Sequence, residues 1–380
     1  MLRRIAIVLS LVCILSVSSA EAKNSSGGGR TGQTLVINGV HNVTYSRLNI
    51  STSNGDCIQL INSTNVTIQA SNIGPCGGRG VLINGGTGNK IYDNYIHVEN
   101  LASGCCDTHD GVAVYNSAND TLQGNVIAYG ETNVEGLGGA TNLSVIGNAL
   151  LNPRGPFPRG QNVQLAGASS STISGNFAYS CTLDGSSGVQ CAASYLYSEN
   201  QEDSINLYYS SNDTVENNYV EGGHSPSGCG IIEDDSSSTE TIANNIVYNT
   251  GQCGINVADG TDSEISGNKI LNLNLVTGGG NTALMIWKEY TPPCGSVLVS
   301  GNTTSEVRSD GYDSGYWDGG GCDPITCDGT QTDVWSCNSF ASYNQLANDA
   351  AVKDPPPIPP MPERCVANSP FSTQTSVPGC

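Results

Sequence analysis

The strongest constraint on this chain is a short repeat, in which an asparagine followed by apolar residues recurs over most of the sequence. The repeated residues are Asn72, Asn94, Asn125, Asn148, Asn176, Asn218, Asn245, Asn268 and Asn302. Their successive spacings are 22, 31, 23, 28, 42, 27, 23 and 34 residues, which a unit of 22 to 23 explains if some units carry insertions. A period of this length predicts a solenoid of stacked turns.

A short segment in which the inward and outward positions alternate lies about fourteen residues before each asparagine. Alternation of this kind is typical of a β-strand that points one side chain inward and the next outward. Each unit therefore buries a thin apolar stripe that becomes a continuous core only when units stack. The predicted inward pairs are Val81/Ile83, Val112/Val114, Val163/Leu165, Ile205/Leu207 and Ile255/Val257.

This pattern resembles the right-handed parallel β-helix of the pectate-lyase-like proteins, over residues 33–302. A leucine-rich repeat would need a regular leucine scaffold, and a β-propeller would need about four strands in each 40-residue blade. The resemblance implies an all-β, single-domain β-helix of about ten turns over residues 23–302. Residues 303–380, where the pattern fades, are expected to form an irregular, disulfide-pinned extension that packs on the helix or caps it.

The N-terminus is typical of a secretory signal peptide over residues 1–22, with a basic start, an apolar run over 5–17 and a small-residue cleavage site. The run is short for a membrane span, which needs roughly 20 residues. We therefore expect a secreted, extracellular protein that is not associated with a membrane. Sequons such as Asn42-Val43-Thr44 could carry glycans, although they can also arise by chance in a chain rich in Asn and Thr.

Of the 15 cysteines, one lies in the predicted signal, and the remaining 14 are an even number suited to disulfides in an oxidising compartment. Cys229 and Cys253 occupy the same position of successive repeats. Stacked strands lie about 4.8 Å apart, inside the Cα window of roughly 4.4–6.8 Å for a disulfide, so we predict that bond. The pairs Cys57/Cys76 and Cys181/Cys191 could staple neighbouring loops, but sequence leaves their connectivity open.

Composition limits the partners of the protein. The formal net charge of −20 argues against nucleic acid, and an anionic substrate would need local basic groups or a bridging cation. With 47 Gly and only 13% charged residues, long helices are not expected. We expect a monomer that acts on a polysaccharide without a required cofactor. The acidic, glycine-rich segment 309–324 could bind Ca²⁺, although a solvated loop is the simpler interpretation.

Stacking the repeats places two outward residues of each turn in two columns. Gly136, Gly138 and Ala166 would then form a shallow trough between Tyr115 and Tyr208, which lie three turns or roughly 14 Å apart. Aromatic rings beside amides suit carbohydrate, although tyrosine is also common on plain β-sheets. The predicted substrate-binding residues are Tyr208, Gln164, Asn206, Asp234, Arg154 and Trp287.

Three insertions precede strands that flank or cross this trough. They lie between Asn94 and Gly111, between Asn148 and Asn162, and between Asn176 and Ser204. The second carries Arg154 and Arg159. In stacked repeats such insertions collect on one side, often the binding side, so they favour a cleft.

The residue before the aligned glycine forms a further column, in which Arg79 and Asp110 are neighbours across one turn. The stretch Asp107-Thr108-His109-Asp110 is similar to the Asp-Pro-His-Asp motif of β-helical mannuronan C5-epimerases, with Thr108 in place of proline. This resemblance implies that His109 and its neighbours handle the proton at C5 of a uronic acid.

Epimerases and β-eliminating lyases share that first step. A base with a pKa near neutrality, here His109, removes the C5 proton while a cation neutralises the substrate carboxylate. Arg79, Arg154 or Arg159 would neutralise the carboxylate, and Tyr115 or Tyr208 would donate a proton. We favour a polysaccharide lyase, with a C5-epimerase as the closest alternative. The predicted catalytic set is His109, Asp110, Asp107, Arg79, Tyr115 and Arg159.

Two other classes of function remain open. A glycoside hydrolase needs two carboxylates, roughly 5–5.5 or 6.5–9.5 Å apart. The candidates are Asp110, Asp203, Glu233 and Asp234. Alternation points Glu233 inward and Asp234 outward, and a solvated turn is the simpler interpretation of this acidic run. A non-catalytic β-helix for adhesion or carbohydrate binding is the last alternative, since fold does not fix function.

Overall fold

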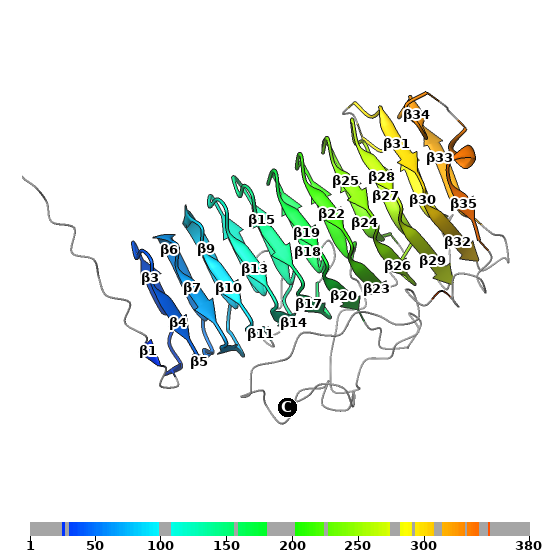
Figure 1. Cartoon of the computed structure of the whole chain (residues 1–380). Helices are drawn as coiled ribbons and strands as arrows, with labels where there is room; N and C mark the ends of the chain where they lie inside the picture. Colours follow the sequence, from blue (N-terminus) through cyan, green and yellow to red (C-terminus); the bar gives the residue numbers. More distant parts are fainter. Residues whose placement is uncertain are drawn as a thin grey trace, which may run out of the picture.

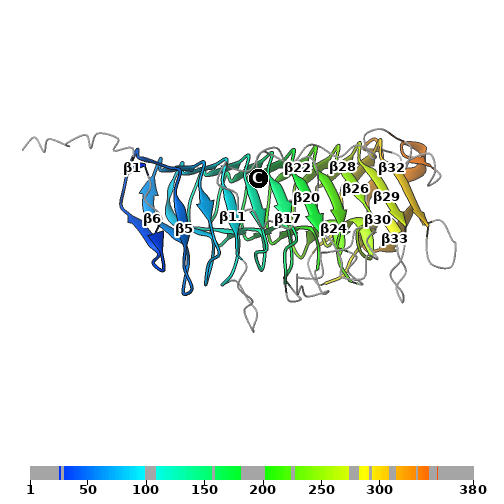
Figure 2. The ribbon, with the colours of Figure 1, turned by 90° about the horizontal axis from the view of Figure 1, so that it is seen from below.

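The structure, a computed structural model, describes residues 25–26, 30–98, 108–155, 159–180, 202–223, 227–273, 282–290, 293–307, 314–330, 333–341 and 349. The described chain winds into three parallel sheets, called sheets A, B and C (Figure 1). In each sheet the neighbouring strands come from successive coils, which is the right-handed parallel β-helix that the repeat predicts. The coils follow one another along a single long axis (Figure 2).

The strands of each sheet follow in chain order. Sheet A contains β1 (Ser25–Ser26), β4 (Thr44–Ser46), β7 (Thr67–Gln69), β10 (Lys90–Tyr92), β13 (Thr121–Gln123), β16 (Ser144–Ile146), β19 (Thr172–Ser174), β22 (Thr214–Glu216), β25 (Thr241–Ala243), β28 (Glu264–Ser266), β31 (Val297–Ser300) and β34 (Ile325–Thr326). Sheet B contains β2 (Arg30–Thr31), β5 (Asn49–Ser51), β8 (Asn72–Ile73), β11 (Tyr95–His97), β14 (Val126–Ala128), β17 (Ala149–Leu151), β20 (Phe177–Ser180), β23 (Tyr219–Gly222), β26 (Ile246–Tyr248), β29 (Lys269–Leu273), β32 (Thr303–Val307) and β35 (Ser339–Phe340). Sheet C contains β3 (Leu35–Asn38), β6 (Ile58–Thr64), β9 (Val81–Thr87), β12 (Val112–Tyr115), β15 (Val134–Leu137), β18 (Val163–Ala166), β21 (Ile205–Tyr208), β24 (Cys229–Asp234), β27 (Cys253–Ala258), β30 (Thr282–Trp287) and β33 (Tyr316–Gly320).

One coil runs through a strand of sheet C, then sheet A, then sheet B. The inward side chains of the three sheets meet along the axis, and all the predicted inward pairs are fully buried there. The stacking continues past residue 302, because β33 adds a strand to sheet C, β34 one to sheet A, and β32 and β35 two to sheet B. Among the described residues, one short 3₁₀ helix, η1 (Val334–Ser336), is the only helical element, and no helix is long and apolar enough to cross a membrane.

The repeated asparagines form a buried ladder at the corner between sheets A and B. Each side-chain amide donates to the side-chain oxygen of the next asparagine, from 3.0 Å for Asn94 to Asn125 through to 2.9 Å for Asn302 to Asn338. The same amide donates to a main-chain carbonyl, as Asn218 does to Ile173 at 2.9 Å. The main-chain N–H also donates to the next asparagine oxygen. The ladder therefore satisfies polar groups that this sharp corner would otherwise leave buried without partners.

The ladder begins at Asn94 and not at Asn72, which corrects one member of the predicted repeat. Asn72 lies in β8 and pairs with Tyr95, one position further along. Ser71 occupies the equivalent position, and its N–H donates to the side-chain oxygen of Asn94 at 3.0 Å. The true first spacing is therefore 23 residues, in agreement with the unit length.

The predicted glycine trough is wrong by one residue in β15. Glu135 pairs with Ala113 and Gln164, and Leu137 pairs with Tyr115. Gly136 instead occupies the inward column, so Glu135 and Leu137 replace the two glycines on the outer face of sheet C. A shift of one residue moves every side chain of a strand to the opposite face, because the side-chain period of a strand is two.

Four disulfides join described cysteines. Cys229–Cys253 confirms the predicted bond between stacked strands, and Cys57–Cys76 forms one of the two suggested loop staples. The other suggested pair, Cys181/Cys191, lies outside the described residues. Cys294–Cys322 and Cys327–Cys337 pin the C-terminal coils.

Buried carboxyl groups line the corner between sheets C and A. Asp213 accepts a hydrogen bond from the N–H of Ser171, and Glu240 accepts one from the N–H of Asp213 at 2.7 Å. Burial, with the nearby charges of Asp213 and Glu233, raises the pKa of Glu240 to about 9. Burial raises the pKa of Glu233 to about 8. Glu233 points inward, as alternation predicts, and accepts a hydrogen bond from the Ser263 hydroxyl.

The asparagine ladder generates a prediction for stability. Replacing Asn218 by alanine removes hydrogen bonds to Asn176, Asn245 and Ile173, and leaves buried partners unsatisfied. Asn218→Ala should lower the free energy of unfolding by about 2–4 kcal/mol in urea titration. The control is Asn217→Gly, since Asn217 is exposed with φ of 56°, a conformation that glycine adopts freely. Equal losses in both variants would contradict the role of the ladder.

The buried carboxyls generate a prediction for pH. Folded Glu240 keeps its proton up to about pH 9, whereas its ordinary pKa is 4.5. Between these values the folded state binds more protons, so the free energy of unfolding should fall as pH rises. The melting temperature of the wild type should decrease as pH rises from 5 to 9. The decrease should be less steep in Glu240→Gln. The control Glu264→Gln changes a half-buried glutamate of β28 and should behave like the wild type. A flat or rising profile in the wild type would contradict this.

Candidate active site

Up to β30, the long connections between strands join sheet B to sheet C. They carry the insertions, as between β11 and β12, β17 and β18, and β20 and β21, whereas only two residues separate β13 from β14. The strands of sheet C begin where these connections end. Side chains at the start and on the outer face of sheet C are therefore the natural candidates for a site.

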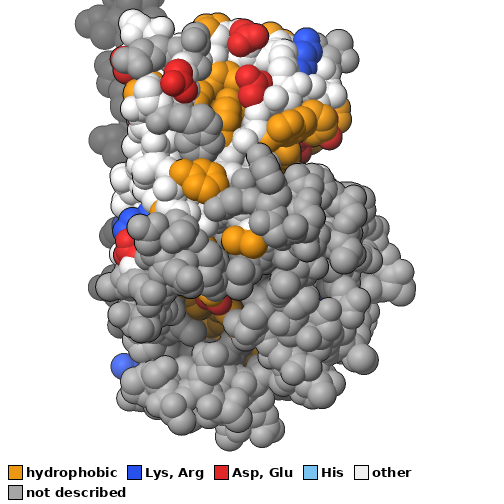
Figure 3. Space-filling view, turned by 90° about the vertical axis from the view of Figure 1, so that its right-hand side faces the viewer, with side chains coloured by type: hydrophobic (Ala, Val, Ile, Leu, Met, Phe, Trp, Pro, Cys, Tyr) orange, Lys and Arg blue, Asp and Glu red, His pale blue; other side chains and the backbone are white. Residues whose placement is uncertain are grey.

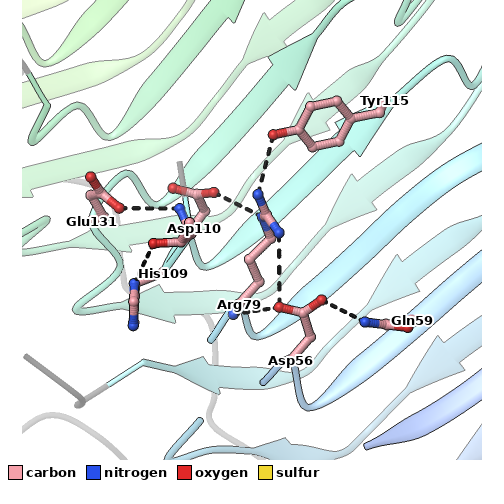
Figure 4. A network of polar contacts seen from close by, with 8 residues as sticks. Asp56, Gln59, Arg79, His109, Asp110, Tyr115 and Glu131 are labelled. Carbon is pink, nitrogen blue, oxygen red and sulfur yellow. Dashed lines mark hydrogen bonds and ion pairs between the residues drawn. The ribbon is translucent and has the colours of Figure 1, made fainter. Parts of the chain in front are cut away.

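A polar network surrounds Arg79, just before β9 (Figure 4). Its Nε lies 3.2 Å from a carboxylate oxygen of Asp110, which is fully buried. Its Nη1 lies 3.9 Å from Asp56, and its Nη2 donates to the Tyr115 hydroxyl at 3.3 Å. Burial lowers the pKa of Arg79, but the attraction of Asp110, Tyr115 and Asp56 outweighs this effect. The net shift of the pKa is upward, so the guanidinium stays charged. The carboxylates of Asp110 and Asp56 therefore already balance the positive charge of Arg79.

His109 lies at the edge of this network, before the buried Asp110. Its Nδ1 is 2.7 Å from the hydroxyl of Thr108, and its ring points away from Arg79 (Figure 4). Partial burial and the charges of Arg154 and Arg79 lower the pKa of His109. The imidazole is consequently neutral at neutral pH, the state that a general base requires.

Tyr115 keeps its phenolic proton. Burial and the negative charge of Glu135 raise its pKa to about 12, despite the nearby Arg79. Glu135 is fully buried on the outer side of sheet C, and Glu131 is nearly so. Glu131 accepts a hydrogen bond from the N–H of Thr108 at 3.3 Å, which ties the end of the insertion to β15. Neither glutamate was predicted from sequence: the register error placed glycine at the position of Glu135, and Glu131 precedes the strand.

The other basic candidates differ in exposure. Arg154, predicted to bind substrate, is only 6% exposed and donates from Nη2 to the carbonyl of Val98 at 3.0 Å, so it braces the connection before β12. Arg159 is half-buried and acts on the pKa of Glu202. Asp107 lies outside the described residues.

A second cluster, called the acid cluster, comprises Glu202, Asp203 and Asp234. Asp203 is buried at the start of β21, where one oxygen accepts the N–H of Cys229 at 2.7 Å. Asn206 donates from its Nδ2 to Asp203 at 3.0 Å and to Asp234 at 3.4 Å. These two distances limit the separation of the two carboxylate oxygens to about 6.4 Å. Asn206 is 2% exposed, and its own Oδ1 has no hydrogen-bond partner.

Glu202 completes the acid cluster beside Arg159 and Gln161. Gln161 donates from its Nε2 to a Glu202 oxygen at 3.4 Å. Glu202 and Asp234 are partly exposed, whereas Asp203 lies beneath them. Asp203 and Asp234 were predicted from sequence, whereas Glu202 was not, because it lies outside the aligned columns of the repeat. Its adjacency to Asp203 was the available signal.

The acid cluster has strongly raised pKa values. Burial and the charge of Asp234 raise the pKa of Glu202 to about 7, and Arg159 acts in the opposite direction. Burial and Glu202 raise the pKa of Asp203 to about 7. Burial and Asp203 raise the pKa of Asp234 to about 7, with Glu289 and Asp235 adding to the shift. Near neutral pH the cluster therefore holds protonated and ionised carboxyls together, as acid–base catalysis requires.

The remaining predicted substrate-binding residues lie in the columns beside the acid cluster. Tyr208 pairs with Asp234 across one strand, and Trp287 follows Ala258 in the same column. Gln164 pairs with Asn206 in the other column and is buried. The structure thus gathers Tyr208, Asn206, Asp234 and Trp287 on one stretch of sheet C. His109, Arg79 and Tyr115 lie together several strands away.

Among the described residues, no group of three or more His, Cys, Asp or Glu side chains has a geometry that could hold a metal ion. The described cysteines in disulfides are not available as thiolate ligands.

Comparisons with known proteins agree with the fold. The model of a family described as "Periplasmic copper-binding protein (NosD)" matches residues 97–306, and a "Right handed beta helix region" model matches residues 33–155. The comparison with curated proteins found no match.

Solved structures with the same fold differ widely in sequence. DFA-IIIase from Arthrobacter chlorophenolicus A6 is 11% identical with a TM-score of 0.54, covering 84% of this chain and 88% of that one. The Dettilon tailspike protein is 13% identical with a TM-score of 0.50, covering 82% of this chain. This chain spans 63% of the tailspike's length. PfbA, a surface adhesin of Streptococcus pneumoniae, is 12% identical with a TM-score of 0.50, covering 71% of this chain and 72% of that one. Likeness at these identities shows the fold alone.

The cations beside His109 generate a prediction. Because the charge of Arg79 lowers the pKa of His109, Arg79→Gln should raise that pKa toward its ordinary value of 6.5. NMR titration of the histidine ring protons measures the shift, with His109→Ala assigning the signal. Arg47→Gln, a change at an exposed arginine outside the network, should leave the titration unaltered. An identical His109 titration in the wild type, Arg79→Gln and Arg47→Gln would contradict the influence of Arg79 on His109.

Proposed function

This chain belongs to the NosD family of β-helix proteins, and we propose that it uses this fold as a carbohydrate-active enzyme, a glycoside hydrolase. One observation carries the proposal. Glu202 and Asp203, just before β21, gather with Asp234 of β24 beside sheet C, where Asn206 bridges Asp203 and Asp234 and all three carboxyls have pKa values raised to about 7. Paired carboxyls, one protonated and one ionised, are the groups that cleave a glycosidic bond.

The surroundings distinguish the roles of the two partly exposed acids. Arg159 favours the ionised form of Glu202, so Glu202 would serve as the base or nucleophile. The charges that act on Asp234 are all acidic, from Asp203, Glu289 and Asp235, so the proton rests on Asp234. Asp234 would then protonate the leaving oxygen of the glycosidic bond while Glu202 activates water or attacks the sugar.

Asp203 and Asn206 would act through the other two carboxyls. Asp203 is buried and fixed by the N–H of Cys229, so it cannot reach a sugar directly. Its negative charge raises the pKa of Asp234, and Asn206 holds the two side chains in place. Both are therefore positioning residues in this proposal.

A lyase acting on a uronic-acid glycan is the second candidate, with a C5-epimerase using the same groups. What favours it is the neutral imidazole of His109, whose pKa Arg154 and Arg79 lower, close to Tyr115, which retains its proton. His109 would take the C5 proton, and Arg79 would hold the substrate carboxylate. Arg79 is already paired with Asp110 and Asp56, which weakens its attraction for a further anion. We therefore rank this candidate below hydrolysis.

The family description suggests copper, which the described residues do not fit. Copper prefers thiolate, thioether and imidazole ligands. The cysteines of the four disulfides are oxidised, Met285 is buried beside the Cys229–Cys253 pair, and His97 stacks on Tyr95 with ring centroids 4.4 Å apart. Within the described chain, no three His, Cys, Asp or Glu side chains gather as a metal site would require. The proposed mechanism accordingly contains no metal.

Hydrolysis by the acid cluster generates a prediction. Asp234→Asn and Glu202→Gln should each lower kcat by roughly 10²–10⁴-fold, measured as reducing ends released from a panel of polysaccharides. The wild-type rate should decline above about pH 7 as Asp234 loses its proton, and decline at lower pH as Glu202 gains one. Asp262→Asn makes the same charge change at an exposed position outside the acid cluster and should retain most activity.

The assay also separates the candidates, since ultraviolet absorbance records unsaturated products. Unsaturated ends that appear in the wild type, disappear in His109→Ala and persist in Asp234→Asn would favour the lyase and contradict hydrolysis.

A further inference from the structure

The acid cluster is surrounded by further acidic groups. Glu289 and Asp235 both act on the pKa of Asp234, and Glu289 also acts on those of Glu202 and Asp203. The one cation that acts on any of these three carboxyls within the described chain is Arg159. With a formal net charge of −20 for the whole chain, the long-range field adds to this local repulsion. A carboxylate-bearing sugar would be repelled here.

Unpartnered oxygen atoms near the acid cluster call for hydrogen-bond donors. Oδ1 of Asn206 and Oδ1 of Asn256 have no hydrogen-bond partner. Asn206 and Asn256 are each 2% exposed and lie in the same outward column of sheet C. Each of these atoms accepts hydrogen bonds, and leaving it unsatisfied is costly. Sugar hydroxyls donate such bonds, whereas a uronate carboxylate only accepts them.

Aromatic side chains border the same stretch on both sides. Tyr208 pairs with Asp234 on one side, and Trp287 lies two strands away on the other, with the small Ala258 between them. This places a low floor between Asp234 and Trp287, whereas the predicted trough lay nearer the N-terminal coils, between Tyr115 and Tyr208.

The aromatic border continues toward the last coils. Trp317 of β33 lies 5.7 Å from Trp287 between ring centroids and is 44% exposed, and Tyr290 is 48% exposed. A side chain at Gly319 would collide with both tryptophans, so the glycine lets the two rings meet. Figure 3 faces the end of the molecule formed by β33 to β35, where apolar and acidic side chains lie beside each other. Exposed rings next to carboxyls suit sugar faces and hydroxyls.

We propose that the substrate is an uncharged polysaccharide, which runs from the acid cluster over Ala258 and stacks its sugar rings on Trp287, Tyr290 and Trp317. The inference rests on the proposed function, because it takes the acid cluster as the point where the polysaccharide is cleaved. It adds the substrate class and an aromatic subsite. The acidic surroundings exclude polyuronates, the unpartnered oxygens bind hydroxyls, and the rings supply contact area that needs no charge.

The test measures binding separately from cleavage. Asp234→Asn, in which cleavage is disabled, is run in native gels that contain inulin, dextran, xylan or mixed-linkage β-glucan as uncharged probes, and polygalacturonate or alginate as anionic probes. At least one uncharged probe should retard the protein, and the anionic probes should not. Adding Trp317→Ala should weaken that binding roughly tenfold, the loss of about one aromatic stacking contact. The matched control is Phe340→Ala, which removes an equally exposed ring, 46%, from β35 in sheet B.

The outcomes separate this inference from the proposed function. Retardation by polyuronates alone, by none of the probes, or equally in Trp317→Ala and Phe340→Ala overturns the inference. Binding of an uncharged probe that depends on Trp317, without reducing ends from the wild type, supports the inference and contradicts hydrolysis. Cleavage of polyuronate that depends on Asp234 supports hydrolysis and overturns the inference.

Discussion

The asparagine ladder is the interaction on which the rest of the structure depends. At the corner between sheets A and B, each side chain donates to the next asparagine and to a main-chain carbonyl, and accepts from the previous coil. A slip of one residue would break all of these bonds at once and leave their donor and acceptor groups buried without partners. The ladder therefore fixes how each coil sits on the next, and the position of every outward side chain on sheet C follows from that register.

The tightness of this corner also determines where the chain can vary. From β4 to β32 the connections between sheets A and B are only two residues long, so added residues in these coils collect in the connections from sheet B to sheet C. Glu202 and Asp203 stand where the longest of these connections returns to the helix, and His109 and Asp110 stand at the end of another. The ladder supplies a rigid frame, and the returning connections deliver polar side chains to its edge. Both candidate sites thus occur at one kind of position in the repeat.

This frame explains which features could be predicted from sequence. The fold, the inward columns and the Cys229–Cys253 bond follow from period and alternation, which record backbone geometry directly. The segment around Glu135 offers two equally good alternations, Val-x-Gly and Glu-x-Leu, and only the pairing with β12 decides between them. Glu202 was missed because its role depends on Asp234, which lies on the next strand and reaches it only through folding. Raised pKa values likewise depend on burial and on neighbours from other coils. Spacing predicts that Arg79 and Asp110 are neighbours, but it does not reveal that Asp56 also approaches Arg79.

Burial links the stability of this protein to its proposed chemistry. The same cause raises the pKa of Glu240 and Glu233 inside the helix and of Glu202 and Asp234 on its surface. As pH rises through about 7 and beyond, the surface acid loses the proton that catalysis would need, and the interior acids begin to lose the protons that favour the folded state. A highly acidic β-helix of this kind is therefore suited to neutral or mildly acidic surroundings on both counts. The acidity that disfavours anionic glycans on sheet C also makes alkaline conditions unfavourable for the fold.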